Sequence, residues 1–202
     1  MKHLLIAASC ALALFASCIP QAERLQTGDL IFVGIPADYD LDADSMDSAI
    51  AEVDADGQVW IIDATIKYGV DRHPLDTFLR QFTLRDGSLP TFEVKRLRDD
   101  SRAEASVRNA KQYLGLPYDV TFLPDNGAYY CTELVYDSYL DEDGKPLFHA
   151  APMNFRNADG EMPRYWEQLF ARIGQSVPQG VPGTNPQAMS EEPTLRSVNA
   201  AL

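Results

Sequence analysis

Basic residues are scarce in this 202-residue chain, which has 17 lysines and arginines against 30 acidic residues and a formal net charge of -13. A surface of this sign repels phosphate backbones, so nucleic acid is excluded as an expected partner. The sequence also lacks a phosphate-binding glycine loop, a dinucleotide-binding fingerprint and the ligand spacing of a zinc site. We therefore expect no cofactor and no metal.

One acidic stretch has a pattern that calcium loops sometimes show, because Asp38, Asp40, Asp42 and Asp44 alternate along it. An EF-hand loop needs glycine at its sixth position and glutamate at its twelfth, and neither is present in either frame. We interpret the stretch as a solvated acidic loop.

Long hydrophobic runs are limited to Leu4–Phe15, which follows the basic Lys2 and is too short for an ordinary membrane-spanning helix of about 20 residues. The small residues that precede Cys18 resemble a bacterial lipobox. We predict a signal peptide at 1–17, lipidation of Cys18, a tether at 18–27, and a location in the cell envelope with the membrane bound through the lipid anchor. Simple secretion, with Cys18 incidental, is the alternative.

Cysteine is scarce too, with three in the chain. Cys10 lies in the predicted signal and Cys18 at the predicted lipidation site, which leaves Cys131 without a disulfide partner. In an oxidising compartment an unpaired thiol is a liability unless it is buried or used. Cys131 is therefore a candidate nucleophile, and a small buried core residue is the alternative.

The apolar periodicity predicts a mixed α+β domain over residues 28–174. Strands are expected at 29–33, 49–53, 59–64 and 91–97, with a hairpin turn at 54–57. Helices are expected after Pro74, from a Ser101/Glu104 capping box to Leu114, and from Cys131 onward. Residues 175–202 are rich in Pro, Gly, Ser, Asn and Gln and are expected to form a wrapping or mobile tail.

The predicted helix start places Cys131 where unpaired N–H groups and a partial positive charge stabilise a thiolate. Thr132 and Glu133 follow in the first turn, where hydroxyl and carboxylate groups suit the helix dipole. This position favours a reactive thiol.

An ordered set of motifs covers nearly the whole chain after the signal. The motifs are Gly28–Phe32, Ile61–Thr65, Gly69-Val70, Pro74-Leu75, Leu114–Asp119 and Tyr129–Tyr136. This set resembles the permuted papain-like amidases of the YaeF/YiiX type, in the NlpC-like superfamily. The late Pro182–Pro186 is similar to envelope-anchored members from Bacteroidetes.

The resemblance implies a circularly permuted papain-like fold, with a small antiparallel sheet packed on helices. It implies a catalytic cysteine at a helix start, facing a histidine on one strand and a polar residue on the next. Asp63 matches the polar position, which would orient the imidazole; a strand-end carboxylate that reaches solvent is the alternative. Residues near the cysteine are candidates for substrate binding: Tyr118, Tyr129, Tyr130 and Thr132.

The sequence departs from the family at the histidine, which should lie in a His-Val-Gly-Ile-like strand ahead of the 54–57 turn. A pairing of Val53 with Gln58 would place Asp63 opposite Ser48, with Asp47 beside Ser48. Neither Ser48 nor Asp47 can act as the general base that an imidazole provides at neutral pH. The flanking residues suggest that a short segment is missing between Ile50 and Glu52.

Two histidines remain outside the signal region. His73 precedes Pro74 at a predicted helix start, and His149 lies in a polar connection. Both are interpreted as surface or capping histidines rather than as the base.

We expect an envelope thiol hydrolase, an amidase or peptidase that forms an acyl-enzyme on Cys131 and acts on cell-wall peptides or other amides. A binding lipoprotein that has lost its base is an alternative. So is a lipid-directed acyltransferase or esterase of the same fold, with an acyl substrate.

Overall fold

The computed structural model describes residues 22–34, 47–84, 86–157 and 159–202. The predicted signal peptide, Cys18 and the aspartates from Asp38 to Asp44 lie outside the described residues. Within the described ranges, no helix is both long enough and apolar enough to cross a membrane.

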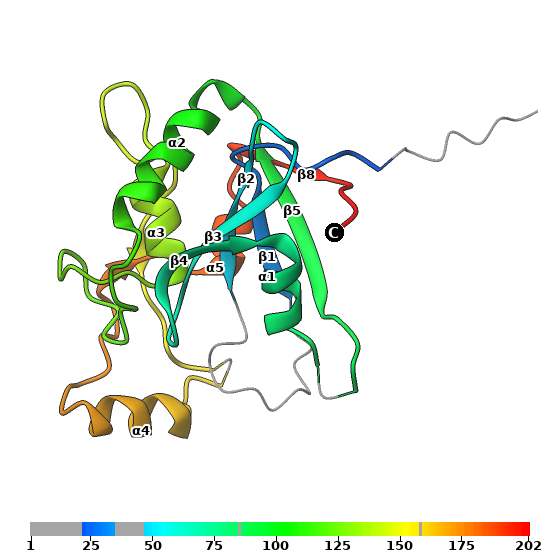
Figure 1. Ribbon diagram of the computed structural model, residues 1–202. Coiled ribbons are helices and arrows are strands. Elements are labelled where there is room, and N and C mark those ends of the chain that lie inside the picture. The colour runs from blue at the N-terminus through cyan, green and yellow to red at the C-terminus, as the bar shows by residue number, and fades with distance from the viewer. Residues whose placement is uncertain (1–21, 35–46, 85, 158) are drawn as a thin grey trace, which may run out of the picture.

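A six-stranded antiparallel sheet forms the centre of the molecule (Figure 1), with the strand order β4-β3-β2-β1-β5-β8. Its strands are β1 (Leu30–Gly34), β2 (Ser48–Val53), β3 (Val59–Thr65), β4 (Gly69–Pro74), β5 (Thr91–Leu97) and β8 (Leu195–Val198). A separate short pair joins β6 (Ala151–Pro152) to β7 (Pro182–Gly183). The four predicted strands are confirmed, and β4 and β8 extend the sheet at its two edges.

The described part of the chain contains five α-helices. They are α1 (Leu75–Gln81), α2 (Ala103–Ala110), α3 (Cys131–Ser138), α4 (Arg164–Arg172) and α5 (Pro186–Ser190). The predicted Ser101/Glu104 capping box is wrong, because the chain enters α2 through a 3-10 turn at Asp100–Arg102, in which Asp99 accepts a hydrogen bond from the N–H of Ser101. A second 3-10 turn at Lys111–Tyr113 follows α2.

The two faces of the sheet bury different hydrophobic cores. Ile50 and Ile62 pack on one face with Leu134 of α3, whereas Ile61 packs on the other face with Phe78 of α1. Successive strand residues point to opposite faces, so runs such as Ile61-Ile62 supply both cores at once. Full burial of each such side chain stabilises the fold by about 1.5–3 kcal/mol. The predicted α+β class, with an antiparallel sheet packed on helices, is confirmed.

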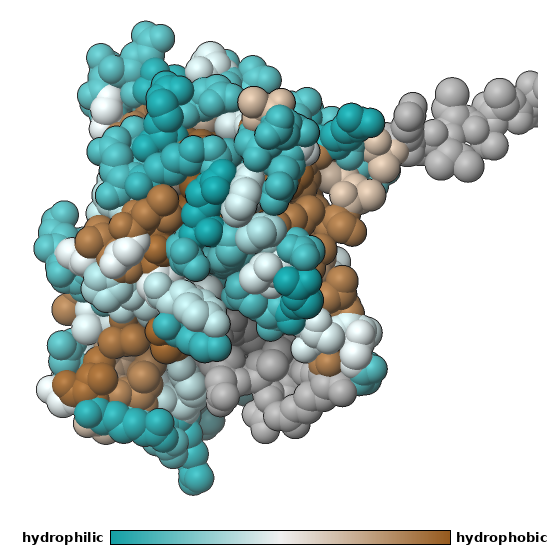
Figure 2. Space-filling view, in the orientation of Figure 1, coloured by the Kyte–Doolittle hydropathy of each residue, from teal (hydrophilic) through white to brown (hydrophobic). Residues whose placement is uncertain are grey.

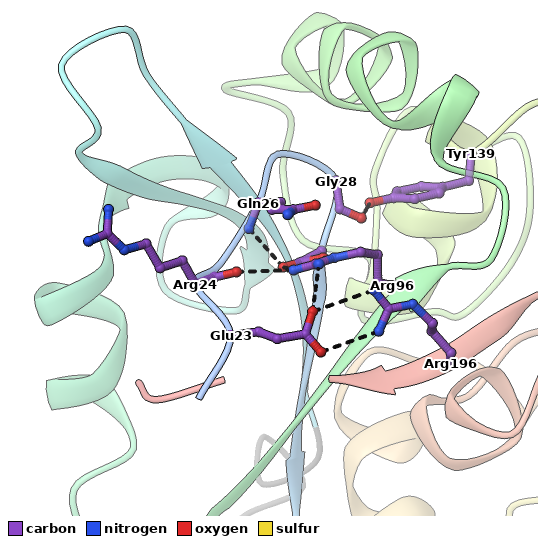
Figure 3. Close-up of polar contacts among 8 residues, drawn as sticks. Glu23, Arg24, Gln26, Gly28, Arg96, Tyr139 and Arg196 are labelled. Carbon is purple, nitrogen blue, oxygen red and sulfur yellow. Dashed lines mark hydrogen bonds and ion pairs between the residues drawn. The ribbon is translucent and has the colours of Figure 1, made fainter. Parts of the chain in front are cut away.

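The two ends of the described chain meet at one side of the sheet. Arg96 of β5 donates two hydrogen bonds to the buried Asp29 carboxylate and one to Glu23, and Arg196 of β8 also lies near Glu23 (Figure 3). Leu25 is buried in the core that α1 covers. The segment that precedes β1 is therefore docked on the sheet beside the C-terminal strand.

Gly28 connects this docked segment to α2 and α3. Its φ of +84° is a left-handed conformation, and a Cβ at this position would lie 2.6 Å from the Cβ of Ala103. Its carbonyl accepts a hydrogen bond of 2.9 Å from the hydroxyl of Tyr139 (Figure 3). Both the backbone conformation and the close approach require glycine.

Candidate functional site

Cys131 is the first residue of α3, as predicted. Tyr130 caps the helix in an extended conformation, and its N–H donates to the Glu133 carboxylate at 3.4 Å. Leu134 and Val135 bury the apolar side of the helix against the sheet. The sequence places the thiol here because the apolar spacing begins the helix at this residue and the Glu133 side chain caps the Tyr130 N–H.

The Cys131 thiol is 6% exposed and lies beside Asp47 and Ser48, where β2 begins. Burial, and then the charge of Asp47, raise the pKa of the thiol well above its ordinary value, and the Ser48 N–H and hydroxyl oppose the rise. The expectation that the helix start lowers this pKa is therefore wrong. Desolvation of the thiolate exceeds the effect of the helix dipole.

The β2-β3 hairpin differs by one residue from the predicted register. Val53 pairs with Val59, so Asp63 lies opposite Ala49 rather than Ser48. The turn has this length because the Asp54 N–H bonds to the Gln58 carbonyl and the Asp54 side chain holds the turn N–H groups.

The segment expected to be missing between Ile50 and Glu52 stays a prediction. β2 continues through these residues with a regular register to both neighbouring strands. The Asp47 carboxylate, just before β2, lies beside the Cys131 thiol, and β2 itself contains no histidine.

Asp63 is completely buried on β3, and neither of its oxygens accepts a hydrogen bond from any residue that the structure describes. Burial, and then the nearby Asp47 and Asp71, raise the pKa of this carboxyl well above its usual range. The alternative of a carboxylate that reaches solvent is wrong. The shift favours the protonated form of Asp63, because burial disfavours a charge without hydrogen-bond partners.

His73 is 7% exposed on β4, so its interpretation as a surface or capping histidine is wrong. Its Nε2 lies 3.6 Å from Oδ2 of Asp63, and its ring stacks with that of Phe78 at 6.3 Å between centroids. Burial lowers the pKa of His73, and Asp71 opposes that shift. Sequence reasoning missed this placement because residues 69–74 were not predicted as a strand. As strand β4 they pair His73 with the buried Ile61.

His149 is a surface histidine, as predicted. Its side chain is 81% exposed and pairs with the Glu192 carboxylate at 3.0 Å. It therefore has no place in the buried cluster around Cys131.

The four residues proposed for substrate binding differ in their burial. Thr132 is fully buried, and Tyr130 is nearly so, with its hydroxyl accepting a hydrogen bond of 3.0 Å from the Thr184 N–H. This burial gives both residues a structural role, and their part in substrate binding stays a prediction. Tyr118 and Tyr129 are half-buried and pair through their backbones in an isolated β-bridge. Their role in binding stays a prediction.

An aromatic cluster lies next to the start of α3. Phe122, with a φ of 52°, contacts the rings of Tyr130, Phe155 and Trp166 at 5.1 to 5.8 Å between centroids. Phe155 and Trp166 were not predicted as site residues, because they follow Cys131 in loops and in α4. Figure 2 shows hydrophobic surface near α4, at the lower left of the view.

Glu133 gives the helix start an unusual carboxyl. It is mostly buried, and burial followed by the charge of Asp119 raises its pKa to about 8. At neutral pH this group is mainly protonated, so it does not supply the first-turn negative charge that we expected.

The chain is similar to known proteins over most of its length. Residues 24–199 match the family model described as permuted papain-like amidase enzyme, YaeF/YiiX, C92 family. A segment of 92 residues is 30% identical to the uncharacterized protein YiiX of Escherichia coli (strain K12), covering 46% of this chain and 45% of that protein. The chain therefore matches less than half the length of this curated relative.

The fold is similar to a crystal structure of metalloprotein yiiX from Escherichia coli O157:H7, with a TM-score of 0.66 and 22% identity over 89% of this chain and 99% of that one. The described part of the present chain has no group of three or more His, Cys, Asp or Glu side chains arranged to hold a metal ion. The match supports the permuted papain-like fold.

Proposed function

The chain belongs to the permuted papain-like amidase family, and on that premise we propose that it is a cysteine amidase of the cell envelope. The Cys131 sulfur attacks the carbonyl carbon of an amide, the amine leaves with a proton, and water hydrolyses the resulting thioester. Peptides such as those of the cell wall are the proposed substrates. The proposed lipid anchor at Cys18 would hold the domain at a membrane.

One observation carries the proposal: the thiol at the start of α3 lies beside the Asp47 carboxylate. Because its pKa is raised, Cys131 is a thiol rather than a thiolate at rest, and a base must remove its proton as the bond forms. Asp47 is in place to accept that proton. The N–H of Cys131, at the helix start, would stabilise the oxyanion.

Substitution of Asp47 provides the test. Asp47→His places an imidazole beside the thiol, and we expect it to raise kcat/KM for a peptide amide at pH 7 by about 10-fold or more, since general-base catalysis contributes about 10²- to 10⁴-fold. Asp47→Asn should lower turnover, and Cys131→Ala should abolish it. Asp56→Asn, in the exposed hairpin turn, is the matched control. Turnover that persists in Cys131→Ala contradicts the proposal.

A binding function is the second candidate, and the raised pKa of the buried Cys131 favours it. A protein of this kind would bind peptides or other amides without cleaving them. Wild-type protein that binds a cell-wall peptide by calorimetry, shows no turnover, and keeps the same affinity in Cys131→Ala would support this candidate over the amidase.

A further inference from the structure

Three titratable side chains form an oblique row across three neighbouring strands. Asp63 on β3 lies opposite Ala49 of β2 on one side and Asp71 of β4 on the other. Asp47 is two residues before Ala49, and His73 is two residues after Asp71. Residues two apart on a strand share a face, and diagonal neighbours are about 7–8 Å apart at the backbone. Asp47, Asp63 and His73 therefore follow one diagonal on one face.

Asp63 is the middle member of the row and lies between the carboxylate and the imidazole at its two ends. Asp63 is fully buried and accepts no hydrogen bond from the described residues. Its Oδ2 lies 3.6 Å from Nε2 of His73, and Asp47 is the charged neighbour that affects it most. A buried carboxyl in such surroundings either keeps its proton or shares it with a neighbour.

The Asp47 end of the row reaches the thiol of Cys131. A lone carboxylate, with an ordinary pKa of about 3.9, is poorly matched to a thiol as a base at neutral pH, whereas an imidazole, at about 6.5, is better matched. The row connects the carboxylate beside the thiol to a buried imidazole on β4.

We propose that His73 is a positioning residue that supplies the imidazole of this site from β4, through the carboxyls of Asp63 and Asp47. This inference deepens the proposed function and rests on Cys131 as the nucleophile. As the sulfur forms its bond, the thiol proton passes to the Asp47 carboxylate, and the Asp63 acid passes its own proton to Nε2 of His73. The products are an Asp47 acid, an Asp63 carboxylate and an imidazolium, so the protons balance without another reactant.

The other groups around His73 do not replace Asp63 as the buried partner. Asp71, on the same strand, is half exposed and lies 3.9 Å from Nδ1 of His73. From α1, the uncharged Gln81 amide lies 3.4 Å from Nε2. The charged α1 residues Asp76 and Arg80 pair with each other at the surface, at 2.8 Å.

The test measures alkylation of Cys131 by iodoacetamide in the full chain between pH 5 and pH 9, together with peptide amide turnover. Wild type should show an inflection between about pH 5 and 7.5 that coincides with the titration of His73 followed by ¹⁵N-histidine NMR. His73→Gln should lose this inflection and alkylate about 10-fold or more slowly at pH 7. Asp63→Asn should behave in the same way, and the surface variant His149→Gln should match wild type.

A folded His73→Gln variant with the wild-type alkylation profile overturns the proposal, as does Asp63→Asn that keeps the inflection. If both variants fail to fold, wild type alone decides: an inflection that does not coincide with the His73 titration overturns the inference. Glu133→Gln removes the separate group that titrates near pH 8. If alkylation shows the expected His73-dependent inflection but neither wild type nor any variant hydrolyses the peptide amide, the amidase function is overturned. The proposed proton transfer to His73 is then still supported.

Discussion

The Arg96 guanidinium donates two hydrogen bonds, of 2.6 and 2.8 Å, to the buried Asp29 carboxylate (Figure 3). Asp29 directly precedes β1, and Arg96 lies on β5, so the pair joins two neighbouring strands beside the docked chain ends. Bidentate pairing of this kind compensates the cost of burying both charges.

We predict that Arg96→Met lowers the free energy of unfolding by about 3–5 kcal/mol, because it leaves the Asp29 carboxylate buried without its partner. Urea unfolding followed by circular dichroism measures the loss. Arg80→Met, which breaks the exposed pair with Asp76, should change stability by less than about 0.5 kcal/mol. Equal losses in the two variants would contradict a special role for the buried pair.

Glu133 should make the stability of the protein fall as the pH rises. Its pKa in the folded state is about 8, above the ordinary value of 4.5. The folded state therefore binds the proton more tightly, so the stabilisation is complete below pH 4.5 and is lost as the pH rises through 8. Because the site is partly solvated, we expect a loss on the order of 2 kcal/mol.

Glu133→Gln keeps the acceptor for the Tyr130 N–H and removes the titration. Unfolding free energies should be similar for wild type and variant at pH 5, and the variant should be the more stable protein at pH 9. Parallel stability curves across this range would show that Glu133 has an ordinary pKa.

Iodoacetamide should alkylate Cys131 more slowly at pH 6 than it alkylates a free cysteine peptide. The thiol is 6% exposed, and burial raises its pKa, so both access and thiolate fraction are reduced. Mass spectrometry of timed samples gives the two rates. If the protein reacts faster than the free peptide, the helix start stabilises the thiolate more than burial disfavours it.

Palmitate labelling should mark the mature protein in its bacterial host, because small residues precede Cys18 in a lipobox-like pattern. Cys18→Ala should abolish the label, and Cys131→Ala should retain it. Label that persists in Cys18→Ala would contradict lipidation at Cys18 and favour the alternative of simple secretion.

Local patterns in the sequence were sufficient for most of the fold. An apolar run predicted β1, a hairpin signal predicted β2 and β3, and alternation predicted β5. The residue pattern also predicted that α3 begins at Cys131. These features depend on residues close together in the chain. The edge strands β4 and β8 were missed because their sequences are more polar and gain strand structure by pairing with a sheet already formed.

Three features could be read from the sequence alone: Cys131 begins a helix, Asp63 lies in an apolar strand, and the strand expected to carry the histidine has none. Tertiary structure decided the rest. The pKa of Cys131 is raised because distant segments exclude water from it, and His73 meets Asp63 because β4 pairs with β3 in one register. Burial and register arise from contacts between segments far apart in sequence, so no local pattern around Cys131 or His73 contains them.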